Sequence, residues 1–398
     1  YEKKLFWFAF FVRVVYVFLS YGFFYLMNNE PFEFSAGDSK GYHGEALWIV
    51  DLLQRNHLDN YIRYLGGGFS DAGYPVFLSL FNFFGETILI PRLVHAWLGA
   101  KTAVLAMHLA TRNFNQKTGR LAGLLVALMP SLIYYTGLHL KETLMIYFLM
   151  LFLNKGDLMI RQRVFNPKKV MTVLFTGLIL FFFRTVLGVA ALFSLGTALI
   201  FSDRRLSSLS YRFKAALVTG VVGLLFVVSF FSKEIGFYYE HSDSNLNDQM
   251  EHYANRTDGN KLAKYGKASL FVPVILIVPL PTIVDTKQQN QFMIHGAVLI
   301  KNIMAFFVLF ALFKFWRQKR MRQHILLLSF MLAYLGILVN SAFAFSERFH
   351  LVIIPVFLVL AAEGIRQYRW RIQTFQIYLT FLFVLIIGWN WFKLAGRA

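Results

Sequence analysis

One carboxylate lies about ten residues after the first long apolar run of this 398-residue chain. Asp38 comes after Gly37, near the start of a polar stretch over 28–87. A carboxylate within hydrogen-bond reach of a hydroxyl can take its proton while the hydroxyl oxygen attacks an electrophile. The residues alone leave a second interpretation open, in which Asp38 is a solvated loop residue or caps a helix that begins before Tyr42. We therefore treat Asp38 as a candidate general base.

The elements that must position this carboxylate are apolar. Hydrophobic residues make up 57% of the chain and charged residues only 15%, and long apolar runs recur along its whole length. A helix needs about 20 apolar residues to cross a bilayer core. We predict an all-α integral membrane protein, one polytopic domain over 1–398 with about eleven transmembrane helices and additional helices in its extracytoplasmic loops. The predicted spans are 5–27, 88–111, 121–136, 140–153, 170–183, 186–201, 214–231, 291–313, 325–344, 350–365 and 374–391.

The distribution of charge predicts the topology. The formal net charge is +19, and most Lys and Arg residues lie in short loops between apolar runs, which is typical of cytoplasmic loops that face anionic lipid. The partner is therefore a lipid bilayer and not a nucleic acid. This pattern places the N-terminus in the cytoplasm and the loops 28–87 and 232–290 outside, in a bacterial inner membrane or a plasma membrane. Arg13 lies within the first span and is predicted to snorkel to the inner surface.

Both predicted external loops contain apolar segments that are not assigned as spans. In 28–87, four apolar residues at helical spacing predict an amphipathic helix on the membrane surface; they are Ala46, Ile49, Val50 and Leu53. In 232–290, the segment 271–284 contains three prolines and is predicted to be re-entrant or to lie on the surface. External polar segments on one face of a helical scaffold are where we expect a site.

Neither the cysteine count nor the acidic residues indicate a cofactor. The chain has no cysteine, so thiolate metal sites are excluded. Five candidate ligands in the second external loop have spacings that fit no tight metal site, and we expect them to be solvated; they are His241, Asp243, Asp248, Glu251 and His252. We expect no cofactor. A divalent metal stays open as an alternative, although no ligand cluster supports one.

Several motifs resemble the GT-C superfamily of membrane glycosyltransferases. Asp38-x-x-x-Tyr42-x-x-x-Ala46 after a first span, followed by Gly73-Tyr74-Pro75, is similar to the opening of that superfamily, and more closely to the polyprenyl-phosphate-sugar transferases related to protein O-mannosyltransferases. Residues 1–155 carry most of the resemblance and 290–365 a looser part. The supporting motifs are Pro91-Arg92-Leu93-Val94, Met129-Pro130-Ser131, Tyr134-Tyr135, Lys141-Glu142, and Ser346-Glu347-Arg348-Phe349-His350 followed by Pro355. Many members follow the catalytic aspartate with a second acid, whereas Ser39 and Lys40 follow here.

The resemblance implies an activity and roles for the residues that match. It implies an inverting transferase that moves a hexosyl or pentosyl group from a polyprenyl-phosphate donor to an extracytoplasmic glycolipid, polysaccharide or protein, with Asp38 as general base. Cations would stabilise the departing phosphate, and topology selects Arg184, Arg348, Lys141 and Arg92. The sugar or the acceptor would contact Tyr42, His43 and Glu142.

Each of these residues also has a purely structural interpretation. The four cations fit interfacial side chains, His43 fits a packing histidine, and Glu142 fits either a helix-start acid or a partner of Lys141. Two other functions also stay open. One is a polymerase or ligase that uses polyprenyl-diphosphate glycans. The other is a flippase or transporter of lipid-linked sugars, which would need charged residues near the bilayer midplane.

Overall fold

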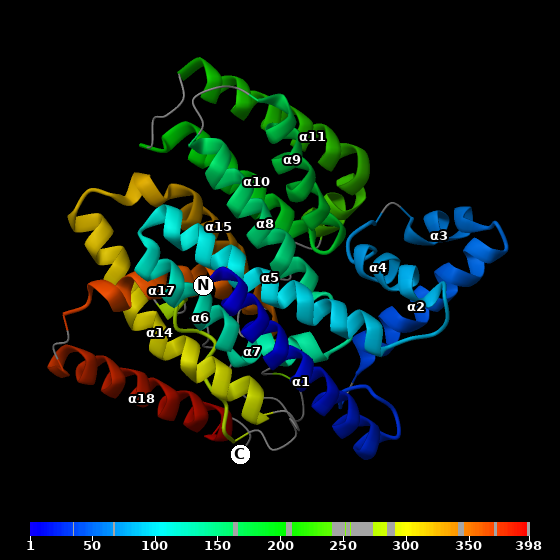
Figure 1. Ribbon diagram of the computed structural model, residues 1–398, viewed down its shortest axis with the longest axis horizontal. Coiled ribbons are helices and arrows are strands. Elements are labelled where there is room, and N and C mark those ends of the chain that lie inside the picture. The colour runs from blue at the N-terminus through cyan, green and yellow to red at the C-terminus, as the bar shows by residue number, and fades with distance from the viewer. Residues whose placement is uncertain are drawn as a thin grey trace.

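The computed structural model describes residues 1–34, 36–66, 68–161, 166–203, 209–240, 251, 255, 274–284, 291–340, 346–369 and 372–395. Regular secondary structure within these ranges is entirely helical (Figure 1). In chain order the helices are α1 (Glu2–Asn28), α2 (Gly37–Gln54), α3 (Leu58–Leu65), α4 (Gly73–Asn82), α5 (Leu89–Asn113), α6 (Gln116–Leu128), α7 (Pro130–Tyr134), η1 (Tyr135–Gly137), α8 (Glu142–Ile160), α9 (Pro167–Ile179), η2 (Leu180–Phe182), α10 (Thr185–Phe201), α11 (Leu209–Glu240), α14 (Gln291–Arg317), η5 (Met321–His324), α15 (Ile325–Asn340), α16 (Glu347–His350), η6 (Leu351–Ile353), α17 (Ile354–Gln367) and α18 (Ile372–Ala395).

Eight helices in the described part of the chain are long and apolar enough to cross a membrane. They are α1, α5, α8, α11, α14, η5 with α15, α16 with α17, and α18. The bent pair formed by α6 and α7–η1, with a 54° angle, gives a ninth if it counts as one span. The prediction of an all-α, multi-pass membrane protein is confirmed. The count of about eleven is not, because α9 has 13 residues and α10 has 17, fewer than the ~20 that a span needs.

Helix ends that are far apart in the sequence meet at one end of the bundle, which we call the site end. Arg348 of α16 contacts both Asp38 of α2 and Glu142 of α8. Lys141, which precedes α8, donates to the carbonyl of Phe183 after η2 at 3.0 Å. The site end therefore collects the starts of α2, α8, α10 and α16 and the end of α9–η2.

The opposite, basic end collects the ends of α5, α8 and α17 and the start of α6. Asp157 near the end of α8 accepts hydrogen bonds from Arg112 and Arg161 at 2.9 and 3.0 Å. Glu363 of α17 accepts one from Thr118 of α6 at 2.6 Å. The buried acids at this end are thus paired.

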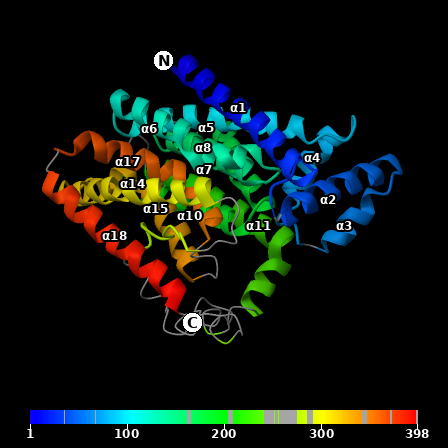
Figure 2. The same ribbon diagram turned by 90° about the horizontal axis from the view of Figure 1, so that it is seen from below.

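Helices α2, α3 and α4 form a small group beside the bundle. Figures 1 and 2 show them next to α1 and α5, at the edge of the molecule away from α18. The predicted amphipathic stretch is part of α2: Ala46, Ile49 and Val50 are buried, and Ile49 packs with Tyr61 of α3. Leu53, expected on the same face, is exposed instead. The location of this helix on a membrane surface stays a prediction.

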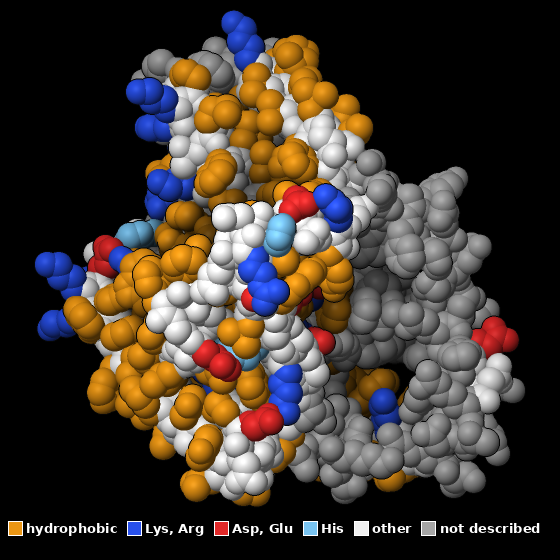
Figure 3. Space-filling model, turned by 90° about the vertical axis from the view of Figure 1, so that its right-hand side faces the viewer, with side chains coloured by type: hydrophobic (Ala, Val, Ile, Leu, Met, Phe, Trp, Pro, Cys, Tyr) orange, Lys and Arg blue, Asp and Glu red, His pale blue; other side chains and the backbone are white. Residues whose placement is uncertain are grey.

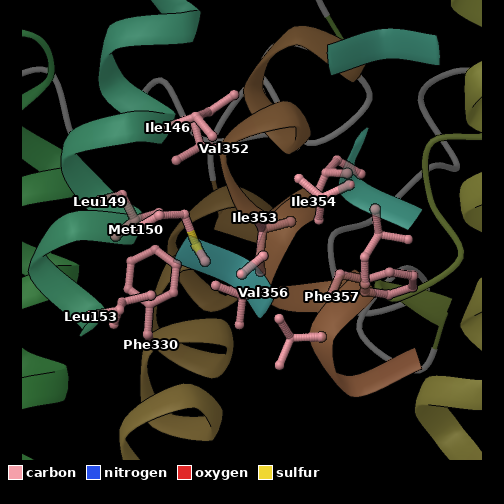
Figure 4. Packing of buried hydrophobic residues seen from close by; sticks show 14 of the residues in the cluster. Ile146, Leu149, Met150, Leu153, Phe330, Val352, Ile353, Ile354, Val356 and Phe357 are labelled. Carbon is pink, nitrogen blue, oxygen red and sulfur yellow. The ribbon is translucent and has the colours of Figure 1, made fainter. Parts of the chain in front are cut away.

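The core of the bundle lies between α8, α15 and α17. Figure 4 shows Leu149, Met150 and Leu153 of α8 close to Phe330 of α15 and Val356 of α17. The most apolar windows of α1, α11 and α18 are by contrast only 28%, 17% and 17% buried. Apolar helices that bury so little against protein must cover their side chains with lipid, so these three helices form the outer surface of the bundle.

Arg13 does not snorkel, and that prediction is wrong. Its side chain is 1% exposed and donates to the carbonyls of Val126 and Ala127 at 3.2 and 3.0 Å, and to that of Ala9 at 3.1 Å. Pro130 has no N–H, so the Val126 carbonyl has no donor four residues ahead, and the helix break at this point interrupts the next hydrogen bond as well. Arg13 replaces the missing donors and fixes the bend between α6 and α7 against α1.

The second predicted external loop, 232–290, is described in part: 232–240 continue α11, residues 251 and 255 are isolated positions, and 274–284 is not among the candidate spans. Lys301 of α14 contacts the carbonyl of Val278, and Asn302 donates to that of Pro279 at 3.3 Å. Irregular backbone at membrane depth is tolerated where protein covers its polar groups. A re-entrant or surface location remains a prediction, and His241, Asp243, Asp248 and His252 lie outside the described residues.

Candidate active site

Asp38 lies in the first turn of α2, at the site end. The turn is held by Ser39, whose hydroxyl donates to the carboxylate of Glu33 in the segment that follows α1. An acid in the first turn of a helix is favoured by the dipole. The Asp38 side chain is 60% exposed, and its Oδ2 accepts from Nη1 of Arg348. The candidate base therefore has one side toward solvent and one toward a cation.

Arg348 binds two carboxylates of different burial. Its Nε donates to Oε1 of Glu142, which is 0% exposed, while Nη1 reaches the exposed Asp38. The Oε2 atom of Glu142 is buried without a hydrogen-bond partner among the described residues. A charge-assisted bond to a buried acid is hard to break and one to an exposed acid is not. The Glu142 contact thus anchors Arg348, and the Asp38 contact is the exchangeable one.

Lys141 is the second cation at this end. It is 3% exposed and forms an ion pair with Asp71, which lies two residues before α4 and has a left-handed conformation with φ 71°. Gly73, two residues after Asp71, lets the start of α4 lie close to the backbone of η2, because a Cβ at Gly73 would be only 3.0 Å from the carbonyl oxygen of Phe182. Burial lowers the pKa of Lys141 below its ordinary value, and the charge of Asp71 opposes that effect. Asp71 therefore helps to keep the buried amine protonated.

Arg184 precedes α10, in the turn where the sequence places it. Its guanidinium carbon lies 4.0 Å from the centre of the Phe349 ring, next to Arg348 in the chain. Its Nη1 is buried and has no hydrogen-bond partner within the described ranges. A buried guanidinium N–H without a partner is costly, and an anion bound at this end would satisfy it.

Tyr42 lies among these charges, one turn after Asp38. Its ring lies 5.8 Å from Nζ of Lys141 and packs edge-on against Tyr74 at 5.2 Å. Burial raises the pKa of Tyr42 above its ordinary value, and the carboxylates of Asp71 and Glu142 add to the rise. The hydroxyl therefore stays protonated at neutral pH and is able to donate a hydrogen bond.

Two predicted site residues, His43 and Arg92, are buried and have other partners than Asp38 and Arg348. His43 is buried, with Nε2 3.0 Å from Oε1 of Glu86 and its ring 5.3 Å from that of His139. Arg92 is 0% exposed and donates to the carbonyl of Pro31 at 2.6 Å, so it holds the segment between α1 and α2. The structure shows no contact of either residue with Asp38 or Arg348 in the ranges it describes.

Three residues at the site were not selected from the sequence. They are Asp71, Tyr135 and Glu347. Asp71 pairs with Lys141, and the hydroxyl of Tyr135 donates to the carboxylate of Glu347 at 2.5 Å, next to Arg348 in the chain. Tyr135 and Glu347 belong to motifs already noted in the sequence, the Tyr134-Tyr135 pair and the Ser346–His350 segment, and Asp71 lies two residues before the Gly73-Tyr74-Pro75 motif. Their partners are between 70 and 212 residues distant, so their pairing carried no local signal.

The surface over α2 to α4 is polar and of mixed charge. Figure 3 faces this side and shows acidic, basic and histidine side chains interspersed, with hydrophobic side chains over the neighbouring regions. Ion pairs such as Arg55 with Asp51 and Arg63 with Asp59 contribute to it. Among the described residues no group of three or more His, Asp or Glu is arranged to hold a metal ion. The acids of the site are instead paired with cations.

No protein-family model matches this chain, and no curated protein matches it either. What the site can do follows from its own geometry. One exposed carboxylate shares an arginine with a buried acid, and Lys141 and Arg184 lie close by. Such a group is able to accept a proton from a hydroxyl while it stabilises a neighbouring anion.

Proposed function

We propose that this protein is an inverting membrane glycosyltransferase, which moves a sugar from a polyprenyl-phosphate donor to the hydroxyl of an extracytoplasmic acceptor. The observation that carries the proposal is the double contact of Arg348 with Asp38 and Glu142. It brings a candidate base and a candidate phosphate ligand together from helices 310 residues apart in the sequence. The resemblance of the motifs around Asp38 and Arg348 to the GT-C superfamily supports the same activity.

The proposed reaction is a displacement at the anomeric carbon of the sugar. Asp38 accepts the proton of the acceptor hydroxyl, whose oxygen forms a bond to the anomeric carbon from the face opposite the phosphate. The bond between that carbon and the phosphate oxygen breaks, and the polyprenyl phosphate leaves with the electron pair. Cations that bind its developing negative charge lower the barrier. We assign this role to Arg348, with Lys141 and Arg184 around it.

The ion pair between Asp38 and Arg348 indicates an order of binding. Without a donor, Nη1 of Arg348 occupies Oδ2 of Asp38, an oxygen that would otherwise be open to the proton of an acceptor hydroxyl. A donor phosphate competes for the exposed arm of Arg348, whereas Glu142 keeps the other arm in place. Donor binding would therefore release Asp38 to accept the proton of the acceptor hydroxyl.

The test is transfer by the purified protein from a panel of radiolabelled polyprenyl-phosphate sugars to extracted glycolipid, polysaccharide and protein acceptors. Asp38→Asn should reduce transfer by at least about 100-fold, within the range of general-base contributions, and leave a folded, membrane-inserted protein. Asp51→Asn is the matched control, because Asp51 is on the same helix and forms an exposed ion pair with Arg55. Full transfer by Asp38→Asn would remove the proposed base.

A polymerase or ligase that uses a polyprenyl-diphosphate glycan is the second candidate. The unpartnered Nη1 of Arg184, close to Arg348, favours it, because a diphosphate leaving group presents two anionic units to two cations. Analysis of the released lipid distinguishes the two enzymes, since one forms polyprenyl monophosphate and the other diphosphate. Movement of lipid-linked sugars across liposomes without bond cleavage would instead indicate a flippase.

A further inference from the structure

A large cavity opens between α14 and α18, at the basic end and away from the candidate active site. Its volume is about 930 Å³, toward the upper end of the range for ligand pockets. Aromatic and aliphatic side chains form its walls; they are Phe306, Phe310 and Phe313 of α14 and Ile377 and Phe381 of α18. Phe313, Ile377 and Phe381 are exposed although they line a concave surface. We call this cavity the α14–α18 groove.

Three cations lie at the mouth of the groove. Lys314 and Arg317 are in the last turn of α14, and Arg369 follows α17. The Nζ of Lys314 lies 5.6 Å from the centre of the Phe310 ring. Within the described part of the chain no acid forms an ion pair with any of the three. The helix dipole favours the two cations of α14, but it does not explain why Arg369 joins them from another segment.

The dimensions of the groove match one leaflet of a bilayer. Phe306 and Arg317 are eleven residues apart on α14, which corresponds to about 16 Å at ~1.5 Å per residue. The hydrocarbon core of a bilayer is about 30 Å thick. The apolar wall therefore has the length of one acyl layer, and the cations lie where the phosphates of that leaflet would be.

We propose that the α14–α18 groove binds an anionic diacyl phospholipid from the leaflet at the basic end. The acyl chains lie along the phenylalanines, and the phosphate lies between Lys314, Arg317 and Arg369. Arg binds phosphate through two parallel N–H donors, and juxtamembrane cations attract anionic lipid. The groove lies at the opposite end from Asp38, so this proposal does not depend on the proposed transferase activity.

The test is native mass spectrometry of the purified full chain in detergent, titrated with dioleoyl phosphatidylglycerol or dioleoyl phosphatidylcholine. We expect the wild type to retain phosphatidylglycerol preferentially. The triple variant Lys314→Ala, Arg317→Ala, Arg369→Ala should bind it on the order of 100-fold more weakly, at about fivefold for each basic residue. Ile377→Trp should fill the groove and lower retention of phosphatidylglycerol at least about tenfold while all three cations remain.

The matched control removes three exposed cations from the same end but outside the groove, Lys117→Ala, Lys168→Ala and Lys169→Ala. This control should retain phosphatidylglycerol as the wild type does. Equal retention of the two phospholipids by the wild type would overturn the proposal, as would equal losses in the two triple variants or full retention in Ile377→Trp. Displacement of phosphatidylglycerol by an equal concentration of polyprenyl phosphate would overturn it too.

Discussion

Replacing Arg348 with glutamine should separate the contributions of the two carboxylates that it contacts. Glu142 is 0% exposed, and its second oxygen already has no partner within the described ranges. Loss of the cation leaves a buried carboxylate uncompensated, which typically costs about 3–5 kcal/mol. Asp38 is 60% exposed, so Asp38→Asn removes only an exposed pair, which contributes about 0–1 kcal/mol.

The measurement is thermal unfolding in detergent, together with sugar transfer, for Arg348→Gln, Asp38→Asn and the double variant Arg348→Gln, Glu142→Gln. We expect Arg348→Gln to lower Tm on the order of 5–10 °C and Asp38→Asn to leave it nearly unchanged. The double variant should recover most of the loss, because a neutral amide replaces the stranded carboxylate. Transfer should be lost in all three, since each lacks either the base or the phosphate ligand.

Two results would refute this reasoning. If Asp38→Asn destabilises the protein as much as Arg348→Gln does, then the exposed contact is not the exchangeable one. If the second substitution, Glu142→Gln, fails to restore Tm, then the buried carboxylate is not the source of the loss. Either result would also undermine the proposed order of binding, which requires Arg348 to remain anchored while Asp38 is released.

Three further predictions concern the scaffold. Arg13→Met should lower Tm in detergent, because the carbonyls of Val126 and Ala127 lose their donors at about 1–3 kcal/mol each; a Tm equal to that of the wild type would contradict the role given to Arg13. Burial and the charge of Arg92 lower the pKa of His139 well below its ordinary value. Below about pH 6.5 the imidazole therefore binds a proton only in the unfolded chain, and the free energy of unfolding decreases as the pH is lowered, by about 1.4 kcal/mol at pH 5.5. A smaller difference in Tm between pH 7.5 and 5.5 in His139→Phe would agree, and an unchanged difference would not. Gly137→Ala places a Cβ 2.6 Å from Oγ of Ser20 and should cost about 1–3 kcal/mol, whereas Gly22→Ala, whose Cβ has no atom within 4 Å, should leave Tm unchanged.

The all-helical, multi-pass character was predictable because apolar runs long enough to span a bilayer are a local property of the sequence. The number of spans was not, since α9 and α10 are shorter than a bilayer core and the break before Pro130 divides another run. Arg13 was assigned wrongly for a related reason. The carbonyls that it satisfies are more than one hundred residues away, and the residues around it favoured snorkelling.

At the candidate site, the sequence selected individual residues better than it selected contacts. Asp38 and Arg348 were both chosen, but their ion pair joins positions 310 residues apart. Lys141 and Glu142 are adjacent, and a pair between them was one expectation. They instead face different partners, Asp71 and Arg348, because neighbouring residues at a helix start point in different directions.

The contact between α1 and the bend at Pro130 also bears on how the chain is made. The ribosome synthesises Arg13 more than one hundred residues before the carbonyls that it binds. Until α6 emerges, a translocon has to insert a helix whose arginine lacks those partners, at a penalty of roughly 2.5–3.5 kcal/mol for a cation at the centre of a span. Its arrival at Val126 and Ala127 would remove that penalty, and so would drive the first helix to its place in the bundle.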